Sequence, residues 1–351
     1  MDSVKHKLIK FRNSKAFTPL LALIFLFIFN FFYIDGFFQI EIKDGRLFGY
    51  LIDILNRGAP LMIIAIGMTL VIATEGIDLS VGAVVAIAGA VAASLIGGEM
   101  QITPAGEIVY ETVTTVPVAV LAALVVAAVF GMWNGFLVSS LKIPAIVATL
   151  ILMVAGRGVA QLITKGQIIT IYYEPYFVIG QGYLLGIPVA IFIVAAVLLI
   201  VGLLMRKTAL GLFIESIGSN DVASRYIGIK EKQIKFIVYI FSAICAAIAG
   251  LIITSNVKAA DANNAGLWME LDAILSVVMG GNSLQGGKFS IVSSVIGALV
   301  VQTLTTTVYA AGITPEVNLV IKGFVVLIIV ILKSDIFKEK LNLLVQRGDR
   351  V

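Results

Sequence analysis

Few residues of this chain have the chemistry that catalysis or metal binding requires. The 351 residues include one histidine, His6, and one cysteine, Cys245. His6 lies in a basic N-terminal stretch, which excludes a histidine-dependent triad and a histidine-ligated metal site in the core. Cys245 lies in an apolar run, where a lone thiol acts as a small packing group and has no partner for a disulfide. We expect no catalytic residue, no cofactor and no metal in this chain.

The polar residues that stand out interrupt long apolar stretches. Glu75 and Asp78 lie in the segment 74–87, with Gly76 between them. A charge at the centre of a membrane helix costs about 2.5–3.5 kcal/mol, so a break between two helices is the cheaper position. Asp78 or Ser80 is suited to cap the following helix. The segment is therefore either a plain helix cap at the membrane surface or a break that lines a pathway.

Two basic residues also fall inside apolar runs. Arg157 is flanked by Gly156 and Gly158, and Lys322 lies nearer the end of its run, where its side chain is able to snorkel. A charge inside the membrane faces the bundle interior or water and requires a partner. Glu75 and Asp78 are candidate partners for Arg157, and the alternative is a structural ion pair or a snorkelling side chain.

The composition indicates which elements must position these residues. Hydrophobic residues make up 60% of the chain and charged residues 13%, with a mean hydropathy of +1.05. A soluble domain is about 45–50% apolar and about 25% charged. This much apolar surface must face lipid.

The apolar runs predict an all-α, polytopic transmembrane helical bundle. A spanning helix needs roughly 20 apolar residues. About ten runs qualify, and the eighth is short enough to be a half-helix or a re-entrant segment. They cover residues 17–34, 52–73, 80–97, 115–139, 144–164, 185–205, 236–255, 270–284, 290–310 and 316–333.

The basic residues orient the bundle. Most of the 25 lysines and arginines fall in segments on one side, whereas the loop 98–114 on the other side has none. Both termini are predicted to be cytoplasmic, with tails 1–16 and 334–351 enclosing a permease domain at 17–333. The first run lacks a small-residue cleavage site and is read as a retained helix rather than a signal peptide.

Several sequence blocks resemble the ribose-type branch of ABC importer permeases. They are Gly76-Ile77-Asp78-Leu79-Ser80-Val81-Gly82, Trp133-Asn134-Gly135, Ala155-Gly156-Arg157-Gly158, Gly218-x-Asn220-x-x-Ala223, and Gly280-Gly281 with Gly286-Gly287. Further blocks at 44–49, 52–57 and 260–268 are most similar to galactofuranose permeases, with fructose permeases as close relatives. Glu75 departs from the family, which usually has glycine or another small residue there.

The resemblance implies a separate cytoplasmic ATPase that docks on the loop 206–235. Within this loop a short helix is expected from Asn220 to Arg225. The docking candidates are Glu215, Gly218, Asn220, Asp221, Arg225 and Gly228. A solvated loop that only enforces topology is the alternative. ATP should be hydrolysed by the partner, because Gly286-Gly287-Lys288 lacks the remaining residues of a phosphate-binding loop.

The family also implies a second permease, either a second copy or a sister chain, and an extracytoplasmic sugar-binding protein. The chain would then move a monosaccharide through a bacterial plasma membrane by alternating access, with lipid and no nucleic acid around it. Amide and carboxylate groups with an aromatic ring recognise sugars, and the polar segment 261–272 has this composition, although an ordinary polar loop is the alternative. The pathway candidates are Glu75, Asp78, Asn134, Arg157, Asn263, Asn264 and Trp268.

Two other functions are weighed against this one. An ion-coupled secondary transporter needs ion-coordinating groups near the midplane, but Arg157 and Lys322 are basic. An intramembrane enzyme is disfavoured by the lack of core histidines, although serine or aspartate chemistry remains open.

Overall fold

A computed structural model describes residues 15–97, 99–102, 104, 108–111 and 114–333. Of the expected tails 1–16 and 334–351, residues 1–14 and 334–351 lie outside the described residues. The described part is mainly helical, in agreement with the predicted helical bundle. Its helices are α2 (Phe17–Tyr33), α3 (Tyr50–Ala73), α4 (Val81–Ile96), α5 (Val116–Ser139), α6 (Ala145–Ile163), α7 (Glu174–Gln181), α8 (Val189–Lys207), α9 (Leu210–Ser219), α10 (Asp221–Tyr226), α11 (Glu231–Val257), α12 (Met269–Met279), α13 (Ile291–Ala310) and α14 (Pro315–Lys333).

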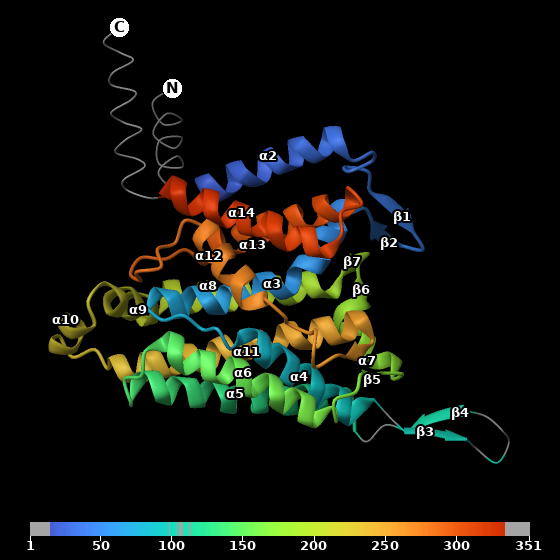
Figure 1. The fold of residues 1–351 in the computed structure, drawn as a ribbon, viewed down its shortest axis with the longest axis horizontal. Helices are drawn as coiled ribbons and strands as arrows, with labels where there is room; N and C mark the ends of the chain where they lie inside the picture. Colours follow the sequence, from blue (N-terminus) through green and yellow to red (C-terminus); the bar gives the residue numbers. More distant parts are fainter. Residues whose placement is uncertain (1–14, 98, 103, 105–107, 112–113, 334–351) are drawn as a thin grey trace, which may run out of the picture.

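Most of these helices run side by side along the long axis of the molecule (Figure 1). Six of them, α3, α5, α6, α8, α11 and α13, are long and apolar enough to cross a membrane. We call one end of the bundle the α10 end, because α9 and α10 lie there, and the opposite end the hairpin end, where strand pairs gather (Figure 1). The start of α2 belongs to the α10 end, since Lys15 donates to the backbone carbonyl of Lys288 in the loop before α13.

Four short antiparallel strand pairs were not expected from the sequence. They are β1 (Glu41–Lys43) with β2 (Arg46–Phe48), β3 (Glu99–Ile102) with β4 (Ile108–Glu111), β5 (Ile169–Thr170) with β8 (Ala259–Ala260), and β6 (Tyr183–Leu184) with β7 (Ile187–Pro188). Each pair is too short to leave a periodic hydrophobic pattern in the sequence. The pairs stiffen connections between helices and leave the helical bundle architecture unchanged.

The helices differ in how much of their surface the protein itself covers. The most apolar window of α3 is 83% buried, whereas that of α8 is 17% buried. The outer faces of α5, α6 and α8 carry exposed residues such as Leu121, Val154 and Leu199. A continuous apolar surface of this kind is typical of contact with lipid or with another apolar chain.

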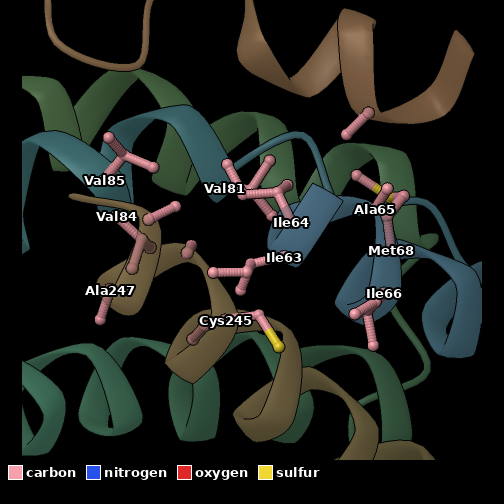
Figure 2. Close-up of a cluster of buried hydrophobic side chains, with 14 of the residues drawn as sticks. Ile63, Ile64, Ala65, Ile66, Met68, Val81, Val84, Val85, Cys245 and Ala247 are labelled. Carbon is pink, nitrogen blue, oxygen red and sulfur yellow. The ribbon is translucent and has the colours of Figure 1, made fainter. Parts of the chain in front are cut away.

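Small residues allow the central helices α3, α4, α5 and α11 to approach closely. A Cβ at Gly131 of α5 would lie 2.7 Å from the Cα of Ile240, and one at Gly67 of α3 would lie 3.0 Å from the Cα of Ser242. Cys245 packs here as a buried apolar group, as predicted, among residues of α3 and α4 (Figure 2). Such contacts are how membrane helices associate where no hydrophobic driving force is available.

The eighth apolar run forms a half-length helix. The helix α12 has 11 residues, or about 16 Å at 1.5 Å per residue. It ends at Met279, short of the predicted boundary at residue 284. The connection 258–268 before it folds back against α4, where a Cβ at Gly266 would lie 2.5 Å from the carbonyl oxygen of Gly82. The eighth run is therefore a half-helix, which is one of the two forms that the sequence predicts.

Candidate functional site

The connection between α3 and α4, residues 74–80, is a buried break in the chain. It turns at Glu75, which has a φ of 62°, and Gly76 is enclosed. Asp78 is 1% exposed and accepts hydrogen bonds from the Ser80 backbone N–H (3.0 Å), the Ser80 hydroxyl (2.6 Å) and the Ser242 hydroxyl (2.9 Å). The prediction that Asp78 or Ser80 caps α4 is wrong, since neither side chain accepts from the first N–H groups of that helix. Asp78 instead joins the break to α11.

Side chains from three further helices close around this break. The Asn134 amide donates to the Ser80 hydroxyl at 2.8 Å, and the Thr149 hydroxyl donates to the carbonyl of Ile77 at 3.1 Å. Ser242 lies eleven residues into α11, about 16 Å from its start at Glu231. The break therefore lies inside the bundle, which favours the pathway interpretation over a cap at the membrane surface.

Two buried polar atoms beside the break have no hydrogen-bond partner among the described residues. They are the Asn134 carbonyl oxygen and the Tyr239 hydroxyl, and both residues are 1% exposed. The Tyr239 hydroxyl lies against the break, because a Cβ at Gly76 would be 2.5 Å from it. Buried polar atoms nearly always find a partner, so this place is suited to receive water or a polar ligand.

A cavity leads from the α10 end toward the break. We call it the α10 pocket. Its volume is about 270 Å³, and its walls come from the break at Thr74–Gly76, the turn between α5 and α6, the helix α10 and the start of α11. Tyr239 lines it, and its hydroxyl lies against Gly76 of the break. Among the predicted pathway residues, Glu75, Asp78 and Asn134 thus lie in or beside one polar region.

Arg157 lies beside the start of α4, just beyond the break, and bonds to the connection 258–268. Its guanidinium donates to the carbonyls of Ala262 (3.1 Å) and Ala265 (2.5 Å), with a long contact of 3.5 Å to that of Gly82. It therefore fastens the connection 258–268 to α4 and α6. The structure gives it no ion pair with Glu75 or Asp78, so the predicted pairing is wrong.

The polar residues of the connection 258–268 mainly bond to one another. Asp261 accepts from the backbone N–H of Asn263 and from the Asn264 side chain, and Asn263 also accepts from Gln161. The hydrogen bond from the Asn264 amide is the main cause that holds the pKa of Asp261 below its ordinary value. Asn263, Asn264 and Trp268 are exposed. No hydrogen bond among the described residues joins them to Asp78 or Asn134, but the neighbouring Gly266 packs on Gly82, two residues beyond the break.

Lys322 is also paired rather than free to snorkel. Its ammonium lies 2.6 Å from a carboxylate oxygen of Asp272, and the two side chains are 15% and 22% exposed. This ion pair joins α14 to the first turn of the half-length α12. The sequence places both residues in the correct segments but does not reveal their contact.

The predicted docking loop contains the expected short helix. The Asn220 side chain caps α10 by accepting from the Ala223 backbone N–H at 2.8 Å, and Gly228 follows its end with a φ of 88°. Asp221 lies 3.7 Å from Lys235 and Arg225 lies 2.8 Å from Glu231. These two docking candidates therefore fix α10 to α11 and do not present free charges to a partner.

The remaining docking candidates, Glu215 and Gly218, belong to α9. Gly218 of α9 packs directly on the carbonyl of Ala73, which also accepts from the backbone N–H of Gly287 at 3.0 Å. Glu215 lies near Lys15. Burial lowers the pKa of Lys15, and the negative charge of Glu215 partly offsets this effect. Gly286 and Gly287 have φ values of 79° and 82°, so they form a turn against Gly218, in agreement with a packing role and not a phosphate-binding one.

Large apolar side chains are exposed at α10, although the sequence analysis named none of them as docking candidates. Val222, Tyr226 and Ile227 are 53%, 88% and 74% exposed. The signal was present in the sequence as apolar residues within a charged loop. Exposed apolar side chains at the tip of a short helix are typical of a protein contact.

Comparisons with known proteins show which family the chain belongs to. The family described as "Branched-chain amino acid transport system / permease component" matches residues 50–330. The galactofuranose transporter permease protein of Escherichia coli is 48% identical over 93% of this chain and 92% of its own length. The fructose import permease protein of Bifidobacterium longum is 40% identical over 83% and 79%, and the ribose import permease protein of E. coli is 36% identical over 81% and 85%.

No solved structure matches this chain. The family match nevertheless covers the break at 74–80, the loop 206–235 and the connection 258–268. The chain therefore belongs to the branched-chain amino acid transport permease family and is a permease subunit of a bacterial ABC importer, which resides in the inner membrane.

Proposed function

We propose that this chain forms the membrane pathway for a monosaccharide, with galactofuranose, fructose and ribose as the candidate substrates. The curated relatives named above are permeases for these sugars, and the galactofuranose permease matches over nearly the whole chain. The observation that carries the proposal is the buried polar break at Asp78, which offers unpartnered polar atoms inside an apolar bundle. A hydroxylated solute requires such groups when it leaves water.

The topology that fits this function has about ten crossings with both termini in the cytoplasm. The six long helices, the helices α2, α4 and α14, and the half-length α12 would supply these crossings. The start of α2 lies at the α10 end, and the basic loop 206–235 lies there too. The excess of lysine and arginine in that loop favours a cytoplasmic α10 end.

The ATPase is proposed to dock on α10. Its exposed Val222, Tyr226 and Ile227 supply an apolar contact, while the ion pairs of Asp221 and Arg225 hold the helix on α11. Movement of α10 would reach the break through α11, because Tyr239 and Ser242 of that helix contact Gly76 and Asp78. ATP would be hydrolysed by the partner subunit, and this chain would carry out no covalent chemistry.

The remaining partners follow from the family. A second permease copy or sister chain would complete the pathway, and an extracytoplasmic sugar-binding protein would deliver the sugar at the hairpin end. The exposed Asn263, Asn264 and Trp268 of the connection 258–268 would meet the sugar or its binding protein there. Arg157 would act indirectly by holding this connection in place.

Reconstitution of the permease with its ATPase and binding protein tests the proposal. Uptake of radiolabelled galactofuranose, fructose and ribose should require ATP and be blocked by vanadate. Val222→Asp should reduce both ATPase co-purification and uptake at least tenfold. Val257→Asp is the matched control for ATPase co-purification, since Val257 is 63% exposed at the hairpin end, away from α10. Uptake of these sugars that needs an ion gradient but no ATPase would refute the proposal and favour a secondary transporter.

A further inference from the structure

The α10 pocket has the dimensions of a small-metabolite site. Its volume of about 270 Å³ lies just below the roughly 300–1,000 Å³ of pockets that hold drug-sized ligands. Four separate parts of the chain meet in its walls: the break after α3, the turn between α5 and α6, the helix α10 and the start of α11. A ligand there would touch both the proposed docking helix and the polar break.

The charges around the pocket favour an anion. Three acidic and four basic residues line the pocket. The acidic ones are Glu75, Asp221 and Glu231, and the basic ones are Lys142, Arg225, Lys232 and Lys235. The ion pairs Arg225–Glu231 and Lys235–Asp221 neutralise two of each sign. Lys142 and Lys232 then remain, opposed only by the exposed carboxylate of Glu75. Neither lysine has an ion pair among the described residues, and lysine is a common ligand for phosphate.

The inner wall of the pocket is suited to hydroxyl groups. Tyr239 lines the pocket, is 1% exposed, and its hydroxyl has no hydrogen-bond partner in the described part of the chain. Ser139 and Thr74 line the same pocket. Glu75 can accept a hydrogen bond from a sugar hydroxyl. The wall thus combines a charged, lysine-bearing side with a side that bonds hydroxyls.

We propose that the α10 pocket binds a phosphorylated monosaccharide from the cytoplasm and that this ligand restrains import. Its phosphate lies between Lys142 and Lys232, and its hydroxyls face Tyr239. By bridging α10, α11 and the break, the ligand holds the docking helix in one position and so opposes transport. A sugar kinase acting on the imported sugar is the class of reaction that supplies such a ligand. This regulatory role rests on the proposed function as a sugar importer, whereas binding itself does not.

Binding is tested on the full chain in nanodiscs of phosphatidylcholine, without other subunits. Fructose 6-phosphate and ribose 5-phosphate should raise the melting temperature of the wild-type chain in a saturable way, and neutral fructose and ribose should not. Lys142→Gln with Lys232→Gln should weaken this apparent affinity at least tenfold. The charge-preserving pair Lys142→Arg with Lys232→Arg should retain most of it, which separates loss of charge from loss of folding.

The matched control is Lys207→Gln with Lys230→Gln, because both lysines are exposed at the α10 end and neither lines the pocket. It should bind like the wild type. An equal loss in this control would show non-specific charge attraction and overturn the site. Equal binding of neutral sugars would assign the pocket to the transport pathway. If phosphatidylglycerol nanodiscs raise the melting temperature without added sugar phosphate, the pocket binds a lipid headgroup. Each of these last two results overturns the proposal.

Regulation is tested separately with the reconstituted importer. Fructose 6-phosphate on the ATPase side should reduce sugar uptake several-fold in the wild type, and the Lys142→Gln, Lys232→Gln variant should resist this inhibition. If no sugar is transported at all, the proposed function fails, but the binding result stands. If uptake is normal and the bound sugar phosphate leaves it unchanged, the regulatory role is refuted while the importer function is retained.

Discussion

The hydroxyl of Ser242 in α11 donates to the carboxylate of Asp78 at 2.9 Å, across 164 positions of sequence. This bond connects the break between α3 and α4 to the helix whose first turn is ion-paired with α10. It is one described route of contacts between the buried polar region and the proposed docking surface. A change in the position of α11 must therefore alter the surroundings of Asp78.

Removal of the Asp78 carboxylate should damage both stability and uptake. In Asp78→Ala, Ser80 and Ser242 lose their acceptor, at a cost of about 1–3 kcal/mol for each buried group left unsatisfied. Ser242→Ala removes one donor and should cost only about 1 kcal/mol. Melting temperatures in detergent and ATP-dependent uptake measure the two effects. A melting temperature of Asp78→Ala at or above that of Ser242→Ala would contradict this ranking.

The Asp272–Lys322 ion pair should stabilise the half-length α12. Lys322→Met leaves a poorly solvated carboxylate without its cation, and breaking such a pair costs about 3 kcal/mol, the lower end of the range for buried pairs. The double variant Asp272→Leu with Lys322→Met removes both charges and should recover most of the lost stability. Thermal unfolding of the wild type, both single variants and the double variant gives the coupling energy. A double variant as unstable as Lys322→Met would rule the pair out as the cause.

Gly218 should tolerate no side chain, because its hydrogen faces the carbonyl of Ala73 and the backbone N–H of Gly287. Gly218→Ala should cost about 1–3 kcal/mol through overpacking and reduce ATP-coupled uptake. Gly202→Ala in α8 is the matched control, since a Cβ there meets nothing within 4 Å. The control should be neutral or stabilising by up to about 1 kcal/mol through helix propensity. Equal melting temperatures for the two variants would show that this contact is not tight.

Acid should loosen the connection 258–268 through Asp261. Its folded-state pKa lies below the ordinary value of 3.8, chiefly because Asn264 donates to its carboxylate. Its contribution to stability is therefore present above that ordinary value and is lost as the pH falls through the lower, folded-state pKa. Asp261→Asn should lack this component, so its melting temperature should fall less than that of the wild type below the ordinary pKa. Parallel melting curves for the two proteins across that range would disprove the assignment.

The sequence alone determined the class of protein and much of its layout. Apolar run length predicts where helices lie, because a bilayer of fixed thickness demands about 20 apolar residues from each crossing. The short run at 270–284 is correctly singled out as incomplete for the same reason. The helix at Asn220–Arg225 is predicted correctly because a cap residue and a terminal glycine act locally. The family motifs are confirmed by the matches to sugar permeases.

Only the tertiary structure decided which polar residues meet. Asp78 with Ser242, Asp272 with Lys322 and Arg157 with the carbonyls of Ala262 and Ala265 are contacts between residues 50 or more positions apart. The incorrect pairing of Arg157 with Asp78 followed from charge alone, which carries no information on helix rotation or depth. The same holds for the exposed apolar residues of α10. They are exposed because the opposite face of this six-residue helix packs on the protein. Local patterns specify elements, but partners depend on how those elements pack, and packing is a property of the whole chain.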